Sequence, residues 1–497
     1  MKKKEMLFAT AYISAFSFAC KGIGMLFRLY LASRMGASGI GLYQLVMSVY
    51  ALFTSFASAG YTVSVSRLAA EDMESASPGQ ASGTTKLAMR MAFISGAASA
   101  ISLALLAPVV SAAVAGEGRT LMPLRILAFS MPFIAVSSCM KGYFMASRKA
   151  IVPASAQLFE ELCKTGITVA LLTFSLSGTT DTGVLCAGIA AGLTAGEVLS
   201  CAYLYVFYRA NTRKHGALPR DASPKRILNV LFPVAAGSWL TSGLHAAENV
   251  LIPYCFALYG GGCEAALAEF GVIRGMAIPV LFFPFAFVSA FISILTPEIS
   301  RLSVADRPAR DAAVGRVFRL TSIISVAAGG VMFFFASEIS EVFYRTSDAA
   351  HAIKLLALVT PFMYIETVCD GVLKSIGEQS FCMRVTLVNC LLRVAAVFLL
   401  IPRTGAEGYI RLLMISNTFS FFACAVKLCR KCRVRGAAIS FVYPLCAAVF
   451  AGMLASFAAS PAGGAVPRLC AGSAVLTIAF ATVCLPLIIK NGHRRTV

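Results

Sequence analysis

Long apolar stretches recur from near the N-terminus to near the C-terminus, and they constrain the fold of this chain more than any other feature. A helix needs about 20 predominantly apolar residues to cross a hydrocarbon core that is about 30 Å thick. Of the 497 residues, 58% are hydrophobic and 13% are charged, and the mean hydropathy of +0.79 leaves no room for a sizeable soluble domain. The sequence therefore predicts an all-α polytopic membrane protein with about 14 transmembrane helices.

The distribution of basic residues sets the expected orientation of these helices. The chain carries 43 basic and 23 acidic residues, a formal charge of +20 that on its own would also suit a nucleic-acid-binding protein. The basic residues instead gather on alternate loops, one group being Arg209, Arg213, Lys214, Arg220, Lys225 and Arg226 and another Lys427, Arg430, Lys431, Arg433 and Arg435. Because basic loops face the cytoplasm, we expect cytoplasmic N- and C-termini and no nucleic-acid partner.

An internal repeat divides the chain. The segment "LRILAFSMPF", which starts at Leu124, aligns with "IKLLALVTPF", which starts at Ile353, an offset of 229 residues. The register continues without a gap, so that Lys164 matches Arg393. The offset spans an even number of expected helices, which makes the repeats parallel. We expect two six-helix lobes around a central cavity plus two C-terminal helices, with residues 1–209 as the first lobe, 210–226 as a cytoplasmic linker, 227–431 as the second lobe and 432–497 as the additional helices.

Two cations interrupt the first apolar stretch. Lys21 and Arg28 lie in "CKGIGMLFRLYL" and share one helical face with small and polar residues, namely Thr10, Ser14, Ser17 and Gly24. A charge at the centre of a membrane helix costs about 2.5 to 3.5 kcal/mol on insertion scales, so this face is expected to turn inward. Two interpretations remain open: pairing with carboxylates or snorkelling to the interface, and binding of an anionic substrate.

A second polar stripe leads the second lobe. Ser238, Thr241, His245 and Glu248 follow helical spacing in the seventh expected span. A carboxylate near the middle of a span needs a cation or a bound ion, so we take His245 and Glu248 as candidates for coupling or gating, with packing as the alternative for His245. Arg274 enters the eighth expected span among glycines and a proline, a composition that permits irregular backbone beside a cavity.

Other charged residues in the spans have candidate partners nearby. They are Glu160, Glu161 and Lys164 in the fifth expected span and Glu366, Asp370 and Lys374 in the tenth. Residues three or four apart are neighbours on one helix, so opposite charges can neutralise each other there. We expect Glu160, Lys164, Glu366, Asp370 and Arg393 to form structural ion pairs. Glu197 has no obvious partner in the sequence around it.

Motifs for catalysis are absent from the sequence. It contains no Walker A, G-x-S-x-G or H-E-x-x-H motif. The one C-x-x-C motif, formed by Cys429 and Cys432, has no second pair or histidine cluster beside it, which argues against a zinc site. We therefore expect no enzyme activity, cofactor, metal or nucleotide, and the sequence does not say whether Na⁺ or H⁺ is a coupling ion.

Several motifs resemble one family. They are "FRLYLASRMGASGIGLYQLVMSVYALF", "AENVLIP", "FGVIRGMAIPVLFFP", "PFMYIETVCDGVLKSIGEQ" and "LIPRTGAEGYI". In this order they resemble the stage V sporulation protein B branch of the polysaccharide and lipid-linked oligosaccharide flippases, a superfamily that also holds lipid II flippases and multidrug and toxin extruders. The resemblance implies alternating-access flipping of an undecaprenyl-diphosphate-linked oligosaccharide or peptidoglycan precursor across a bacterial cytoplasmic membrane, and cell-wall synthesis proteins as partners.

The resemblance also implies positions for a substrate site. Arginines of the first, second and eighth spans line the central cavity of lipid II flippases, and the matching positions here are Arg28, Arg67 and Arg274, which Lys21 joins through its place on the first stripe. Two alternatives stay open. A cation-coupled drug exporter of the same fold would use carboxylates and aromatic residues, and a membrane enzyme that transfers glycans would need carboxylates on a large outer loop.

Overall fold

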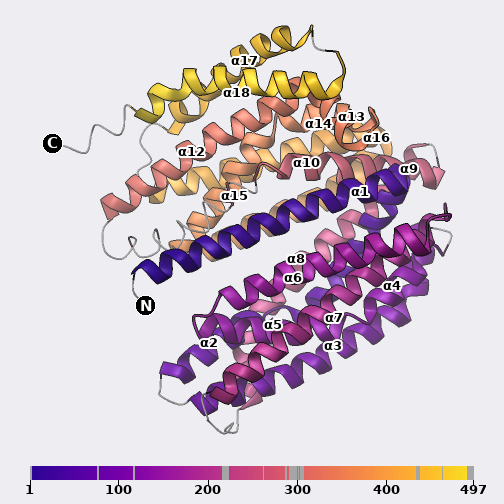
Figure 1. The fold of residues 1–497 in the computed structure, drawn as a ribbon, viewed down its shortest axis with the longest axis vertical. Coiled ribbons are helices and arrows are strands. Elements are labelled where there is room, and N and C mark those ends of the chain that lie inside the picture. The colour runs from indigo at the N-terminus through magenta and orange to yellow at the C-terminus, as the bar shows by residue number, and fades with distance from the viewer. Residues whose placement is uncertain are drawn as a thin grey trace. The chain divides into compact units, whose positions relative to one another are not determined.

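The described part of the chain is helical throughout. The computed structural model describes residues 3–74, 78–115, 118–214, 223–260, 262–285, 288–289, 299, 302, 307–432, 437–461 and 463–489. Within these ranges every element is an α-helix or a short π-helix, so the predicted all-α class is confirmed (Figure 1). By internal contacts the chain divides into two compact units, Met1–Ala268 and Glu269–Val497.

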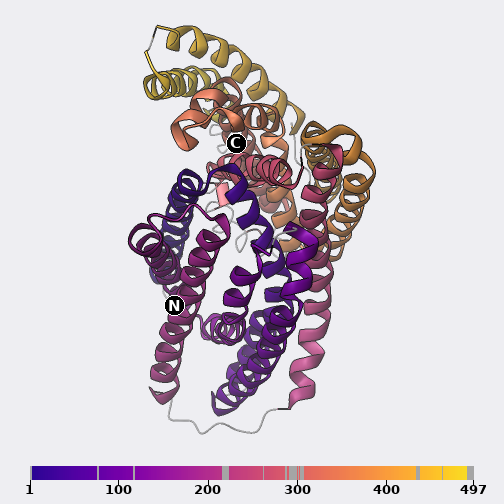
Figure 2. The ribbon, with the colours of Figure 1, turned by 90° about the vertical axis from the view of Figure 1, so that its right-hand side faces the viewer.

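The first unit holds the helices up to α8. Its elements are α1 (Lys3–Ser58), α2 (Tyr61–Glu74), α3 (Pro78–Ala115), α4 (Leu121–Ala128), α5 (Met131–Ala146), α6 (Ile151–Ala170), η1 (Leu171–Ser175), α7 (Thr182–Lys214) and α8 (Pro224–Tyr259). Helix α5 packs against α2, α3 and α7, while α6 packs against α1 and α7. Figure 2 shows these long helices, in indigo to magenta, running alongside one another.

The second unit begins within α9 (Gly262–Phe270). Its elements continue with η2 (Gly271–Ala277), α10 (Ile278–Phe282), α12 (Arg307–Phe334), α13 (Ala336–Tyr344), α14 (Asp348–Ala357), α15 (Thr360–Ser375), α16 (Gln379–Lys431), α17 (Ala437–Ala459) and α18 (Ala465–Ile489). Helix α12 packs against α15 and α17, and α17 packs against α18. A core of buried side chains from α12, α15 and α16 includes Val317, Tyr364, Val368 and Cys424.

Two very long helices each contain a glycine break. In α1, Gly36 has φ of 66°, and in α16, Gly405 has φ of 61°. This left-handed backbone is readily available to glycine, which has no Cβ to clash. Helix α1 has 56 residues and helix α16 has 53. The glycine divides each helix into two parts, and each part is longer than the stretch of about 20 residues that a span requires.

The predicted number of spans is not confirmed in the part of the chain that the structure describes. Among the described residues, nine helices are long and apolar enough to cross a membrane, or up to 11 when two bent pairs are added, so the count of about 14 is not confirmed. The stretches Ala15–Glu74 and Gln379–Lys431 each count once although each contains a glycine break. Helix α6 carries Glu160, Glu161 and Lys164, a charge density that keeps it out of the apolar set.

The structure confirms the internal repeat. Helices α4 and α5 bend by 41° and helices α14 and α15 by 56°. Helix α5 begins at Met131 and α15 at Thr360, 229 residues later, and their last residues keep the same offset. Each bend is followed by a proline in the first turn, Pro132 or Pro361. Proline fits a first turn because the missing N–H has no helical acceptor there.

The predicted lobe boundary and the contact boundary differ. The sequence repeat assigns α8 to the second lobe, whereas α8 packs against α1, α2 and α3 and is grouped with the first unit. Residues 215–222 of the expected linker lie outside the described residues. The division at 209 and 227 therefore stays a prediction.

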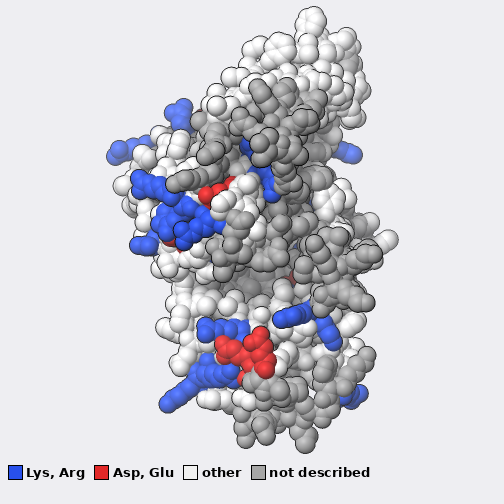
Figure 3. Space-filling view, turned by 90° about the vertical axis from the view of Figure 1, so that its left-hand side faces the viewer, with Lys and Arg blue, Asp and Glu red and all other residues white. Residues whose placement is uncertain are grey.

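Charged side chains are unevenly spread over the surface. On the face in Figure 3, Lys, Arg, Asp and Glu side chains of the described residues lie in groups, and other described parts of this face carry no charged side chain. Exposed apolar side chains are numerous on the apolar helices, for example Leu105 on α3 at 73% and Phe457 on α17 at 81% exposure. Such surfaces suit contact with acyl chains rather than with water.

A close helix approach at the first bend generates a prediction. A Cβ added to Gly96 of α3 would lie 2.7 Å from Cα of Pro132, whereas one added to Gly166 of α6 meets no atom within 4 Å. We expect Gly96→Ala to lower the free energy of unfolding by about 1 kcal/mol or more, because overpacking outweighs the better helix propensity of alanine. Thermal unfolding of the purified protein in detergent measures this effect.

The matched control is Gly166→Ala, which gains helix propensity without a clash and is expected to leave the melting temperature unchanged or higher. Equal melting temperatures for the two variants would show that α3 and α5 do not approach as closely as described.

Candidate functional site

The first half of α1 turns part of its polar stripe toward α6. The two helices pack against each other, and a Cβ on Gly24 would lie 3.1 Å from Oε1 of Glu161. The side chains of Lys21 and Arg28 remain exposed. The stripe therefore lies beside a carboxylate and still leaves both cations accessible.

Charged groups of α5, α6 and α7 form an ionic cluster, which we define as Lys141, Glu160, Glu161, Lys164 and Glu197. Lys164 pairs with Glu161, three residues earlier on α6. Nζ of Lys141 on α5 lies 3.9 Å from Oε2 of Glu160. Glu197 on α7 interacts with Glu160 and lies within the fields of Lys141 and Lys164. The cluster brings together three carboxylates and two ammonium groups from three helices.

The pairing inside the ionic cluster follows the fold more than the sequence spacing. The expected partner of Lys164 was Glu160, but Glu161 occupies the contact and Glu160 faces α5 and α7. Gly196 allows α7 to approach, since a Cβ there would lie 2.8 Å from Cβ of Lys164. Sequence reasoning missed Lys141 and left Glu197 open, and the lone carboxylate in an apolar helix was the signal that it has a distant partner.

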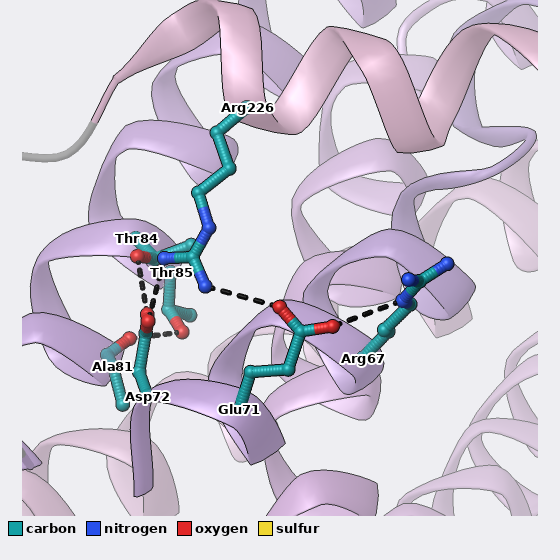
Figure 4. Close-up of polar contacts among 7 residues, drawn as sticks. All are labelled: Arg67, Glu71, Asp72, Ala81, Thr84, Thr85 and Arg226. Carbon is teal, nitrogen blue, oxygen red and sulfur yellow. Dashed lines mark hydrogen bonds and ion pairs between the residues drawn. The ribbon is translucent and has the colours of Figure 1, made fainter. Parts of the chain in front are cut away.

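A second group of charges clamps the end of α2 to the start of α8 (Figure 4). Nη1 of Arg226 lies 2.6 Å from Oδ1 of Asp72, and Nη2 lies 3.1 Å from Oε2 of Glu71. Asp72 is buried and also accepts a 2.8 Å hydrogen bond from Oγ1 of Thr84. Arg67, a predicted substrate residue, is highly exposed and lies 3.0 Å from Oε1 of Glu71. We call Arg67, Glu71, Asp72 and Arg226 the α2–α8 clamp.

The polar stripe of α8 lies within the same unit. Nδ1 of His245 is 3.8 Å from Oε2 of Glu248, three residues later. The side chain of Glu248 is fully buried, whereas that of His245 is 46% exposed. One turn and a half before this pair, Nε1 of Trp239 donates a 3.1 Å hydrogen bond to the carbonyl of Ser55 on α1. The two predicted coupling residues thus form a half-accessible pair on a helix that is anchored to α1.

Arg274 of the second unit lies in a π-helix. The glycines and proline around Arg274 predicted irregular backbone at this position, and η2 spans Gly271–Ala277. The guanidinium lies 5.9 Å from the centre of the Tyr409 ring on α16, within the range of a cation–π interaction. The carbonyl of Met276 accepts a 2.9 Å hydrogen bond from the Tyr344 hydroxyl. Short π-helices within α-helices occur frequently at functional sites.

The predicted ion pairs of the second unit are found in part. Nζ of Lys374 lies 2.6 Å from Oδ2 of Asp370, one turn along α15. Glu366 stands one turn before Asp370 on the same helix and is half-buried. Arg393 is half-buried on α16, which packs against α15, and its pairing with Asp370 stays a prediction.

The predicted substrate residues are distributed over the two units. Lys21, Arg28 and Arg67 belong to the first unit, and Arg274 belongs to the second. Their meeting in one cavity therefore stays a prediction. Within the described ranges, no group of three or more His, Cys, Asp or Glu side chains is arranged to hold a metal ion.

Comparison with known sequences gives consistent matches. A family whose description is "Polysaccharide biosynthesis protein" matches residues 7–294. Stage V sporulation protein B of Bacillus subtilis (strain 168) is 26% identical over 420 residues, which cover 81% of this chain and 79% of that protein. Sporulation protein YkvU of the same organism is 24% identical over 355 residues, 69% of this chain and 76% of that protein.

Solved structures share the fold. Lipid II flippase MurJ in an inward closed conformation superposes with a TM-score of 0.73 at 12% identity, covering 96% of this chain and 99% of that chain. An outward-facing multidrug resistance MATE family transporter of the MOP superfamily gives a TM-score of 0.63 at 14% identity, covering 85% and 96%. The fold expected from the resemblance is confirmed by these likenesses.

Proposed function

Because the chain belongs to the polysaccharide biosynthesis protein family, we propose that it is an alternating-access flippase for a lipid-linked glycan in a bacterial cytoplasmic membrane. The cargo class is an undecaprenyl-diphosphate-linked oligosaccharide or peptidoglycan precursor. The observation that carries this proposal is the accessible pair of cations, Lys21 and Arg28, on a helix that is otherwise apolar enough to cross the membrane. A polar, anionic cargo would compensate the cost of placing these charges in a membrane helix, whereas the packing of helices alone does not require them.

The chemistry of a diphosphate fits these two side chains. Seven residues on one helix separate them by about 10 Å along the axis, at 1.5 Å per residue. Arginine offers a planar fork of donors that grips two oxygens at once, and lysine adds a compact charge. Arg274 is the proposed third cation, supplied by the second unit. Water would hydrate the three cations between cargo visits, and the diphosphate would replace that water during transport.

The substrate proposal predicts graded losses at Arg28. We expect Arg28→Ala to reduce flipping of an undecaprenyl-diphosphate lipid by at least about tenfold, because the charge-assisted bidentate contact is lost. Arg28→Lys should restore only part of the rate, since the charge returns without the fork. The measurement uses purified variants in liposomes with a fluorescent lipid-linked sugar.

The control is Arg125→Ala, which removes an exposed arginine of α4 in the same unit and should flip lipid like the parent. If Arg28→Ala flips lipid at the rate of the parent and an aromatic cation competes for the cavity, the flippase proposal is wrong and the chain is better described as a drug exporter of the same fold.

Glu248 and His245 are the proposed coupling pair. A fully buried carboxylate beside a half-exposed imidazole can take up a cation or proton from one side and release it on the other. We expect Glu248→Gln to fold and to bind the lipid diphosphate, but to lose the dependence of flipping on a pH or Na⁺ gradient. Gradient-driven flipping in proteoliposomes measures it. An unchanged gradient response in this variant would return Glu248 to a packing role.

The proposed orientation places both termini in the cytoplasm. The orientation of helix α8 tests this proposal. Ser223 lies just before the first residue of α8, and the exposed Cys263 lies four residues after its last residue. In cysteine-free protein that carries one thiol, a membrane-impermeant maleimide should label Cys263 in intact cells. It should label Ser223→Cys only after the cells are permeabilised. The reverse pattern would invert the topology, and labelling of both would remove α8 from the set of membrane spans.

A further inference from the structure

A basic cavity lies between α3 and α7 on the first unit, with α5 contributing to its lining. Its volume is about 940 Å³, within the range of small-molecule sites. Lys86 and Arg90 line it from α3, and Arg209 and Arg213 line it from α7. The two cations of each helix are four residues apart, so each helix presents its pair on one face.

The four cations lack acidic partners among the described residues. No ion pair of the described chain includes Lys86, Arg90, Arg209 or Arg213, and no carboxylate lines the cavity. All four side chains are exposed. This differs from the ionic cluster and the α2–α8 clamp, where each arginine or lysine contacts a carboxylate. Four like charges gathered around one hollow repel each other and favour an anionic occupant.

Aromatic and hydroxyl groups shape the cavity. The guanidinium of Arg209 lies 5.9 Å from the centre of the Tyr205 ring, one turn before it on α7. Tyr208 is buried and packs edge-on against Tyr143 of α5, with ring centres 5.0 Å apart. The hydroxyl of Tyr143 accepts a 3.0 Å hydrogen bond from Nδ2 of Asn211. These contacts fix the face of α7 that carries the cations.

An apolar surface begins where the cations end. Phe93 and Ile94 follow Arg90 on α3 and line the same cavity, with 55% and 68% exposure. Farther along α3, Ile101 and Leu105 are 61% and 73% exposed. From Arg90 to Leu105 the helix rises by about 22 Å, at 1.5 Å per residue. A molecule bound here would have its anionic end at the cations and an apolar chain along α3.

From this arrangement we propose that the cavity binds the phosphate head group of an anionic phospholipid, with the acyl chains lying against α3. Basic pockets between membrane helices on the cytoplasmic side suit such head groups. The C-terminal end of α7 lines the cavity and leads into the basic loop. The positive-inside rule assigns this loop to the cytoplasm, so the cavity is expected at the cytoplasmic leaflet. The site is separate from Lys21 and Arg28 and does not depend on the proposed cargo.

The test compares lipids bound to the purified full chain. The probe is phosphatidylglycerol, offered against an excess of phosphatidylcholine in mixed micelles, and native mass spectrometry counts the retained lipid. We expect the parent to retain phosphatidylglycerol selectively. The double variant Arg90→Gln/Arg213→Gln should weaken that binding by roughly tenfold or more, because two charges near the surface are lost.

Two controls separate charge from fold. Arg125→Gln removes an exposed cation outside the cavity and should bind phosphatidylglycerol like the parent. Arg90→Lys/Arg213→Lys keeps the charges and should retain most of the selectivity. The lysine variant could lose the selectivity for phosphatidylglycerol while its melting temperature in phosphatidylcholine equals that of the parent. That result would show that charge does not recognise the head group.

Competition distinguishes the source of the phosphate. Inorganic phosphate at the same concentration should not displace phosphatidylglycerol, because it lacks the chains that cover α3. Full displacement by inorganic phosphate would make the cavity a simple anion site, and preference for undecaprenyl diphosphate over phosphatidylglycerol would make it a cargo site. Equal phosphatidylglycerol binding by the parent and by Arg90→Gln/Arg213→Gln would overturn the proposal directly.

Discussion

Charged side chains in apolar helices require partners, because hydrocarbon supplies neither water nor counter-ions. The ionic cluster supplies partners for the charges of α6, which include Lys141 of α5 and Glu197 of α7. Such contacts constrain how α5, α6 and α7 are rotated about their own axes. The exposed cations of α1 lie on a helix that packs against α6 and its network of charges.

Proline and glycine give the two repeats their common shape. Pro132 and Pro361 stand at the same place after a bend, and a glycine of the neighbouring long helix approaches each of them, Gly96 in one unit and Gly329 in the other. The bend needs a close neighbour with no side chain, so both residues serve one feature. The repeat found in the sequence therefore corresponds to a bend that occurs at the same place in both units.

The sequence predicted features that depend on local pattern. Apolar length predicted the all-α class, the offset of 229 matched two segments whose helices have the same spacing, and the glycines and proline around Arg274 predicted irregular backbone there. It was less informative where distant segments decide the outcome. Glu160 and Glu161 are both near Lys164 on one helix, so only the positions of α5 and α7 determine which of them forms the pair. The count of about 14 spans is not confirmed among the described residues, where glycine breaks join long helices into single stretches and the charges of α6 keep it out of the apolar set.

The position of α8 has a consequence for the order in which the chain assembles. The sequence repeat predicts that this helix opens the second lobe, yet the α2–α8 clamp and the Trp239 contact hold it against helices of the first unit. When α1 to α7 have been inserted, the predicted first lobe is complete, but the first unit still lacks α8 and buried Asp72 still lacks its contact with Arg226. The first unit is therefore completed by α8. We expect its helices to reach their final packing only after α8 has been inserted.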